Sequence, residues 1–357
     1  MAEFHKLKIS ELYKETSDTS VITFDVPENL HESFDFSQGQ HLTLKADIKG
    51  EDVRRSYSLC SSPLDKQWKV AVKQILGGKF STYVNEELAT GDHLEVMAPS
   101  GEFGVHVSPA DAKNYLFFAA GSGITPVLSM VKTHLMAEPN ATCKLFYVNK
   151  TAKSIIFKEE LEQLRNRYFG RFEIYYFLTK EKRDIDLFNG RFDDEKMRVL
   201  TKTFIDIPDT NEVFLCGPEQ MVEYVSEYLI KAGLPKELIH FELFVKGLSE
   251  EDIKRAERLA KQNVEGVEVT IVDGGKEFKF TMTKDYDNVL DAALNAGADL
   301  PFACKGGVCS TCKCEIKEGE VEMKVNYALE EKEVAQNLVL SCQAVPTTDK
   351  VVVDFDV

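Results

Sequence analysis

The chain has 357 residues, of which 59 are Asp or Glu and 43 are Lys or Arg, so its formal net charge is −16. Hydrophobic residues make up 43% and charged residues 29%, which is typical of a globular protein, and the length predicts two or three domains. The negative charge disfavours binding to nucleic acid or to an anionic membrane surface, and no apolar run reaches the length of a membrane span. The first ten residues do not have the pattern of a signal peptide, so we expect a cytoplasmic protein whose thiols are reduced.

Residues 1–106 have the pattern of an antiparallel β domain. Polar and apolar residues alternate in short runs such as SVITFDV and WKVAVKQIL, and Gly, Pro, Asn or Asp separate the runs. Alternation with a period of two predicts strands that are buried on one face. Only FSTYVNEEL has a helical pattern in this region. We therefore predict a small antiparallel β-barrel.

Residues 107–245 change to a strict alternation of strands and helices. Nearly continuous apolar runs, such as NYLFFAAG and FEIYYFLT, predict strands that are buried on both faces. Helical patterns such as TPVLSMVKTHLM and PEQMVEYVSEYLIKAG lie between these runs. The alternation predicts a parallel, doubly wound α/β sheet.

The rest of the chain contains a charged segment and a third domain. Residues 246–265 are highly charged and lack strand character, so we predict a linker with a helical turn or two. Residues 266–357 open with two predicted strands around Asp273-Gly274-Gly275, which is a hairpin signal. A helix over NVLDAALNAGA, a cysteine-rich loop and a closing strand, KVVVDFDV, follow.

Four cysteines of the third domain form a candidate metal site. Cys304, Cys309 and Cys312 are spaced C-x4-C-x2-C, and Cys342 follows thirty residues after Cys312. This is the ligand spacing of plant-type [2Fe–2S] proteins, in which two irons and two sulfides need four thiolates around a tight loop. Structural zinc also takes four cysteines, but usually as two C-x2-C pairs. We therefore predict an iron–sulfur cluster and keep zinc as the alternative.

The surrounding sequence supports the cluster. DLPFACKGGVCSTCKCEI and LVLSCQA resemble plant-type ferredoxins, and the resemblance covers residues 266–357. It implies a β-grasp-like domain that carries single electrons. Gly306 and Gly307 allow a left-handed backbone, and we expect their N–H groups to lie near the cluster sulfurs. The other cysteines outside the motifs are expected to be buried structural residues: Cys60, Cys143 and Cys314.

A one-electron carrier joined to an α/β domain and a β-barrel suggests a flavin and a nicotinamide cofactor, and two elements of the first domain can be tested against the flavin. Arg55, Tyr57 and Ser58 form the motif R-x-Y-S, in which a guanidinium can pair with phosphate and a phenol can pack on a flat ring. Gly77 and Gly78 precede a helix predicted to start near Ser81, where free N–H groups and the helix dipole favour an anion. Each element has an ordinary alternative, since an Arg-Tyr pair is usually surface and a Gly-Gly pair also fits a hairpin turn.

Two elements of the second domain place glycines directly after buried strands. AAGSGITP, with Gly121, Gly123, Thr125 and Pro126, follows the first buried strand but lacks the third glycine of the G-x-G-x-x-G fingerprint. FLCGPEQM places Cys216-Gly217-Pro218 at the end of a late strand. A cysteine at a strand end is by itself more often part of the core.

The order and spacing of these four elements resemble the ferredoxin-NADP reductase family over residues 1–244. The resemblance implies that Arg55 binds the flavin diphosphate and that Tyr57 and Ser58 lie along the ribityl chain and ring. It further implies that Gly121 and Gly123 let the nucleotide pyrophosphate approach. It places four candidate catalytic residues near the reacting rings: Ser58, Thr125, Cys216 and Glu242. The predicted cofactor-binding residues are Arg55, Tyr57, Ser58, Lys73, Gly77, Gly78, Lys79, Phe80, Ser81, Gly121, Gly123, Thr125, Pro126, Lys150, Cys216, Gly217, Pro218 and Phe244.

The order of three domains gives a closer resemblance. The stretch GQHLTLKADIKGEDV before RRSYS and the ending VVVDFDV after LSCQA resemble the family of reductase subunits of bacterial phenylacetyl-CoA epoxidases. That resemblance implies FAD, electron transfer from NADPH through FAD and [2Fe–2S], and a di-iron oxygenase component as acceptor. The charged linker and HFELF, where the family more often has an acidic residue followed by Arg, depart from the pattern. The alternative is therefore a reductase of another hydroxylase, oxygenase or desaturase system.

The choice between NADPH and NADH depends on the segment after the second strand of the nucleotide domain. YVNKTAKS offers Lys150 and Lys153 for a 2′-phosphate, and no acidic residue there could hold a ribose diol. We therefore predict NADPH, with NADH as the alternative. Two other hypotheses for the function remain. One is an assembly subunit that docks through its ferredoxin domain, and the other is a flavin reductase with a zinc-bound tail. The complete set of cofactor motifs favours electron transfer.

Overall fold

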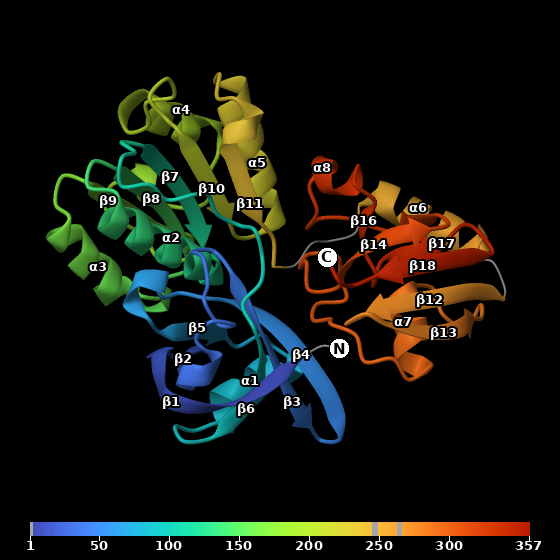
Figure 1. Ribbon diagram of the computed structural model, residues 1–357. Helices are drawn as coiled ribbons and strands as arrows, with labels where there is room; N and C mark the ends of the chain where they lie inside the picture. Colours follow the sequence, from blue (N-terminus) through green and yellow to red (C-terminus); the bar gives the residue numbers. More distant parts are fainter. Residues whose placement is uncertain (1–2, 245–248, 263–265) are drawn as a thin grey trace. The chain divides into compact units, whose positions relative to one another are not determined.

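The computed structural model describes residues 3–244, 249–262 and 266–357, and Figure 1 shows the order of the helices and strands along the chain. The described residues form two compact units. One comprises His5–Val53 and Tyr57–Phe244, and the other is built mainly from residues 249–262 and 266–357. In the described ranges no helix is both long enough and apolar enough to cross a membrane.

The first unit begins with a six-stranded sheet in the order β4-β3-β6-β1-β2-β5, in which the pairs β1–β2, β2–β5 and β3–β6 are antiparallel. The strands span Phe4–Thr16 (β1), Thr19–Asp25 (β2), His41–Ile48 (β3), Glu51–Ser58 (β4), Trp68–Lys73 (β5) and His93–Met97 (β6). Helix α1 (Lys79–Glu86) lies where FSTYVNEEL predicts it, and its Phe80 and Val84 join the core of this sheet. Two short 3-10 helices span Glu28–Leu30 (η1) and Pro63–Asp65 (η2).

A five-stranded parallel sheet follows in the order β11-β10-β7-β8-β9. Its strands span Asn114–Ala120 (β7), Thr142–Asn149 (β8), Phe172–Leu178 (β9), Glu212–Cys216 (β10) and Ile239–Glu242 (β11). The helices span Ile124–Ala137 (α2), Lys158–Arg167 (α3), Asp194–Thr203 (α4) and Glu219–Lys231 (α5), with 3-10 turns at Gly121–Gly123 (η3), Ala152–Ser154 (η4), Asp186–Phe188 (η5) and Lys236–Leu238 (η6). The strand order reverses at β7, which confirms the predicted doubly wound sheet.

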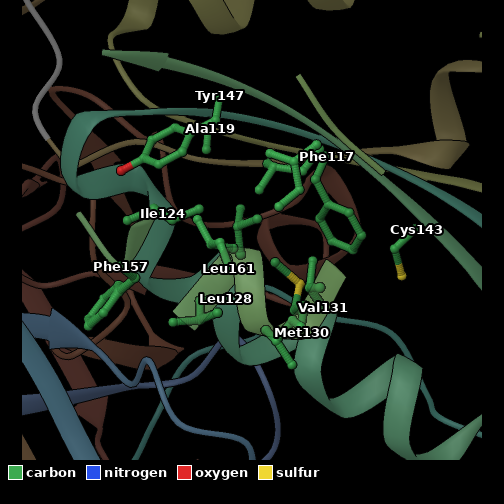
Figure 2. Packing of buried hydrophobic residues seen from close by; sticks show 14 of the residues in the cluster. Phe117, Ala119, Ile124, Leu128, Met130, Val131, Cys143, Tyr147, Phe157 and Leu161 are labelled. Atoms are coloured by element: carbon green, nitrogen blue, oxygen red, sulfur yellow. The ribbon is translucent and has the colours of Figure 1, made fainter. Parts of the chain in front are cut away.

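Side chains cover both faces of this sheet. On one face Phe117 of β7 packs in a cluster with Ile124 of α2 and Leu161 of α3, as Figure 2 shows. On the other face Phe118 packs in a cluster with Val222 of α5. Successive strand residues point to opposite faces, so a strand between two layers of helices must be apolar at nearly every position. This explains the continuous apolar runs in the sequence.

The second unit contains a five-stranded sheet in the order β13-β12-β18-β14-β16 and a two-stranded sheet, β15–β17. The strands span Val267–Asp273 (β12), Lys276–Met282 (β13), Lys313–Glu318 (β14), Val321–Met323 (β15), Leu338–Leu340 (β16), Ala344–Pro346 (β17) and Lys350–Asp354 (β18). Helices α7 and α8 span Val289–Asn295 and Glu331–Val334. Asp273 pairs with Lys276 across two glycines of positive φ, which confirms the predicted hairpin.

The segment predicted as a linker contains a longer helix than expected. Helix α6 spans the 13 residues Glu250–Gln262. Leu259 is buried, Arg255 donates to the Lys324 carbonyl at 3.4 Å, and Asp252 accepts the Tyr327 hydroxyl at 2.6 Å. These three positions lie on one face of the helix, which therefore packs within the second unit. The charged residues on the rest of the helix hide this face in the sequence.

Candidate functional site

The R-x-Y-S motif lies at the end of β4. Tyr57 packs against Phe80 of α1, with ring centroids 5.8 Å apart and ring planes inclined by 35°. Ser58 is buried, whereas Arg55 is exposed and donates to the Arg54 carbonyl at 2.6 Å. The strand thus presents an aromatic ring and a guanidinium, the two groups that a flavin with a phosphate tail requires.

The N-terminus of α1 is arranged to receive an anion. Gly78 is its N-cap, and in the described part of the chain no side chain caps the helix. A Cβ on Gly78 would lie 2.6 Å from the Ser81 hydroxyl, which accepts the Ile75 N–H at 3.1 Å. Gly77 has a φ of +76°, which favours glycine. The first N–H groups of α1 therefore suit a phosphate, as the sequence predicts for this turn.

Asn85 anchors α1 to the sheet, a role that the sequence does not reveal. Its Nδ2 donates to the Val72 carbonyl at 3.0 Å and to the Ser81 carbonyl at 2.8 Å. Its Oδ1 accepts from Lys14 Nζ at 2.8 Å and from Ser20 Oγ at 2.9 Å. The amide thus uses both of its donors and both of its acceptor positions. Its partners come from three strands, so no local pattern could have identified it.

Two lysines predicted to bind cofactor form ion pairs with carboxylates. Lys73 Nζ lies 3.1 Å from an Asp18 carboxylate oxygen, and Lys79 Nζ lies 2.5 Å from Glu51 Oε2. Burial opposes ionisation of Asp18, but hydrogen bonds from Thr16 and Lys73 outweigh it and lower the pKa of Asp18. The positive charges at both positions are thereby partly neutralised before any phosphate binds.

Three of the four candidate catalytic residues lie together. Cys216 and Glu242 are paired residues at the ends of β10 and β11, and Ser58 Oγ donates to Glu242 Oε2 at 3.3 Å. Burial raises the pKa of Glu242 to about 7, against the opposing effect of the Ser58 hydrogen bond. Burial also raises the pKa of Cys216 well above its ordinary value. The group therefore contains a carboxyl able to hold or release a proton near neutral pH and a thiol that stays protonated.

The two glycines of the nucleotide loop have different roles. A Cβ on Gly123 would lie 2.1 Å from the Cys216 carbonyl oxygen, so this glycine lets α2 approach β10. Gly121 has a φ of +54°, and no described atom lies within 4 Å of the position of its Cβ. Thr125, the fourth candidate catalytic residue, is buried and donates to the Ser122 carbonyl at 3.0 Å. The sequence predicts one role for both glycines, but an added Cβ would meet open space at Gly121 and the backbone of β10 at Gly123.

The remaining predicted cofactor-binding residues belong to α2, α5 and the segments beside them. Pro126 is the third residue of α2, and Pro218 is the N-cap of α5. A Cβ on Gly217 would lie 3.0 Å from the Cβ of Ala120, so close packing of β7 also requires this glycine. Phe244 is exposed two residues beyond the end of β11.

The segment after β8 carries charges of both signs. Lys150 and Lys153 are exposed, as a 2′-phosphate site requires. Glu181, from the loop after β9, accepts the Ala152 N–H at 2.8 Å. The sequence shows no acidic residue here, because Glu181 is 29 residues away along the chain. A pocket of about 440 Å³ adjoins it, lined by residues that include Ala152, Lys158, Glu162, Arg165, Glu181 and Arg183.

The four motif cysteines form two pairs. Cys309 Sγ lies 3.0 Å from Cys304 Sγ, and the Cys312 and Cys342 thiols are hydrogen-bonded to each other. The hydrogen bond from Cys309 lowers the pKa of Cys304 to about 5. Among the described residues, no three or more Cys, His, Asp or Glu side chains lie close enough together to hold one metal ion. Two pairs of thiols suit two irons better than the single tetrahedral zinc of the alternative reading.

Backbone N–H groups surround the sulfurs, as the sequence predicts. Gly306 N–H donates to Cys304 Sγ at 3.3 Å, and the Gly307 N–H donates to Cys342. These bonds favour negatively charged sulfur, so the loop fits an iron–sulfur cluster. The predicted structural cysteines Cys60, Cys143 and Cys314 are buried.

Comparison with known domain families divides the chain into three matched stretches. Residues 6–104 match the oxidoreductase FAD-binding domain, and residues 117–227 match the oxidoreductase NAD-binding domain. Residues 271–347 match the 2Fe-2S iron-sulfur cluster binding domain. Flavin, nicotinamide nucleotide and cluster are thus the cofactors of this chain.

Several relatives match over the full length. The chain is 43% identical over 356 residues to a component of the 1,2-phenylacetyl-CoA epoxidase of Escherichia coli (strain K12), and the match covers 100% of this chain and 99% of the relative. It is 32% identical over 354 residues to the ferredoxin reductase component of 3-ketosteroid-9-alpha-monooxygenase of Rhodococcus rhodochrous, covering 98% and 96%. The solved structure of phthalate dioxygenase reductase shares the fold, with a TM-score of 0.60 at 23% identity over 99% of this chain and 98% of that one.

Proposed function

Since the chain belongs to the family of oxygenase reductases with FAD-binding, NAD-binding and 2Fe-2S domains, we propose that it serves a di-iron oxygenase of the phenylacetyl-CoA epoxidase type. It is an NAD(P)H-dependent oxidoreductase of an oxygenase system. When bound, the flavin accepts a hydride from NAD(P)H, and the cluster carries single electrons onward to the oxygenase component.

The proposed partner is chosen by the level of sequence identity to reductases of known oxygenase systems. The epoxidase component is 43% identical to this chain, whereas the 3-ketosteroid and glycine betaine monooxygenase reductases are 32% and 30% identical. All three cover nearly the whole chain, so the difference does not come from a missing domain. A partner of the epoxidase type is therefore supported over another hydroxylase or desaturase system. We place the protein in the cytoplasm, where thiols such as the eight cysteines of this chain stay reduced.

The flavin site that we propose joins β4, α1 and β11. Arg55 and the N-terminus of α1 provide positive charge for the diphosphate, and Tyr57 provides the aromatic surface. Ser58 orients the Glu242 carboxyl through the 3.3 Å hydrogen bond. Because the pKa of this carboxyl is raised to about 7, Glu242 can hold or release a proton beside the ring at neutral pH.

NADPH is the donor that we propose, on the charge of Lys150 and Lys153. A 2′-phosphate gains from both cations, whereas NADH has no group that needs them. The negative charge of Glu181 opposes this preference for NADPH. Its carboxylate already accepts the Ala152 N–H, however, and so is less available to the hydroxyl groups of a ribose. Replacing both lysines by Ala should raise KM for NADPH about tenfold and leave KM for NADH unchanged.

Cys304, Cys309, Cys312 and Cys342 are the cluster ligands that we propose. Their arrangement in two pairs and the N–H groups of Gly306 and Gly307 support this set. The backbone N–H donors would stabilise the negative charge of the thiolate ligands.

The first experiment is an anaerobic titration of the purified, cofactor-loaded protein with NADPH and then NADH. Bleaching of the flavin absorption followed by a rhombic EPR signal of a reduced [2Fe–2S] cluster is the expected result. Mixing the reduced protein with a purified phenylacetyl-CoA epoxidase oxygenase component should reoxidise the cluster within the turnover time. Reoxidation by a different oxygenase, with none by the epoxidase component, would overturn the proposed partner and leave the reductase activity intact.

A further inference from the structure

Gln343 follows the ligand candidate Cys342, and neither the family motifs nor the sequence analysis assigns it a role. The residue lies between β16 and β17, and only 6% of its surface is exposed. Its N–H donates to the Leu340 carbonyl at 2.8 Å, and its carbonyl accepts the Lys324 N–H at 3.0 Å. The backbone at this position is therefore fixed on both sides, which restricts where the buried amide can point.

The side-chain amide points at the cysteine loop. Nε2 lies 3.0 Å from the Lys305 carbonyl oxygen and 3.5 Å from Cys342 Sγ. A carbonyl oxygen can only accept, so the amide nitrogen, not the amide oxygen, must face Lys305. The nitrogen carries two hydrogens, of which one serves the carbonyl and the other is left for the sulfur. The Lys305 contact thus fixes the orientation that makes Gln343 a donor to Cys342.

Gly307 makes room for this arrangement. A Cβ on Gly307 would lie 3.3 Å from Gln343 Cγ and 3.0 Å from Val325 Cγ2. Its φ of +73° also disfavours any other residue. The glycine therefore permits two things, the approach of its own N–H to Cys342 and the passage of the Gln343 side chain.

We propose that Gln343 is a positioning residue that raises the reduction potential of the [2Fe–2S] cluster through its N–H···S hydrogen bond to Cys342. The proposal rests on the ligand role proposed for Cys342. Reduction of a cluster held by Cys342 and the other ligands would add one electron, and part of the added negative charge would fall on the ligand sulfurs. A fixed N–H donor stabilises the reduced state more than the oxidised state, so it raises the potential. If the amide of Gln343 served only to hold the Lys305 carbonyl in place, its removal would leave the reduction potential unchanged.

Gln343→Met tests this proposal, because Met has a similar length and no donor. The full-length protein, loaded with FAD and cluster, is titrated against redox mediators and followed by the EPR signal of the reduced cluster. The expected result is a lower potential, with the one-electron equilibrium shifted about three- to tenfold toward the oxidised cluster; tenfold corresponds to about 59 mV. Gln343→Leu also removes the donor and adds no charge, so it should lower the potential by a similar amount. It provides the readout if the Met variant loses its cluster.

Ser341→Ala is the matched control. Ser341 is fully buried two residues before Gln343, and its hydroxyl donates to the Cys312 carbonyl at 3.1 Å rather than to a sulfur. This variant should lose stability and keep the wild-type potential. A wild-type or higher potential in both Gln343 variants would overturn the proposal.

Failure of the ligand assignment is separate from failure of the proposal. If Cys342→Ser keeps the iron content and EPR spectrum of the wild type, Cys342 is not a ligand and the proposed site is wrong at that residue. If Cys342→Ser loses or alters the cluster while the Gln343 variants keep the wild-type potential, only the role of Gln343 is wrong.

Discussion

Gly123→Ala should destabilise the first unit far more than Gly121→Ala, although the two residues belong to one motif. The Cβ added at position 123 would lie 2.1 Å from the Cys216 carbonyl oxygen and 2.5 Å from the carbonyl carbon. Ordinary contacts begin at about 3.4 Å, so the backbone of α2 or β10 must move by about 1 Å. Both elements are packed in the centre of the nucleotide domain, where such a shift disturbs many neighbours.

The expected cost of Gly123→Ala is about 3 kcal/mol, the upper part of the range for overpacked sites, because the obstacle is backbone and cannot rotate away. Gly121→Ala meets no described atom within 4 Å. Its cost comes from placing a Cβ on a residue of φ +54°, which amounts to about 1 kcal/mol. Gly123 has a φ of −61°, so its variant has no such backbone cost and isolates the steric effect.

Urea unfolding of the FAD-loaded protein, followed by the fluorescence of released FAD, measures both variants on the first unit. KM for NADPH is measured on the fraction that stays folded. Gly121→Ala should raise KM if the pyrophosphate approaches the open space at this residue, as the sequence predicts. A Gly123→Ala variant of wild-type stability with a raised KM for NADPH would refute the packing argument and restore the shared role that the sequence predicts.

Three further predictions concern other parts of the chain. Asn85→Ala removes four hydrogen bonds, so it should cost about 3 kcal/mol and weaken FAD binding in a fluorescence titration. Asn85→Asp keeps an acceptor for Lys14 and should lose less stability, and equal losses in the two variants would contradict this reasoning. Cys312→Ser should lose cluster iron and Cys314→Ser, equally buried, should keep it, and iron analysis that shows no difference would disprove the ligand set. The pKa of Glu242 is raised from 4.5 to about 7, so the folded protein favours the protonated carboxyl. The stability that this protonation contributes is fully present below about pH 4.5 and is lost as the pH rises through 7. The side chain introduced by Glu242→Gln does not titrate. The urea midpoint of this variant should therefore rise relative to that of the wild type between about pH 5 and pH 8, and a difference in midpoint that does not change with pH would argue against the raised pKa.

Local patterns in the sequence were sufficient for the fold. Continuous apolar runs identified β7 to β10 because a strand between two helical layers must be apolar on both faces. The hairpin at Asp273 followed from two adjacent glycines, since few other residues accept the positive φ of a tight turn. Helix α6 was underestimated, because its packed face consists of three positions among many charged ones.

The residues of the candidate site likewise fall into those that local motifs identify and those that only the fold brings together. The cysteine spacing and the R-x-Y-S and Gly-Gly motifs are short stretches whose chemistry is local. The sequence by itself was therefore enough to identify them as candidate binding elements. Asn85, Glu181 and Gln343 were missed because each acts on a group from another part of the chain.

Only the tertiary structure shows the surroundings of the predicted site residues. It pairs Lys73 and Lys79 with carboxylates, brings Ser58 within hydrogen-bonding distance of Glu242, and presses Gly123 against β10. The physical reason is that a motif fixes the kind of side chain at a position. Burial, charge pairing and steric room depend on partners that folding brings from other elements.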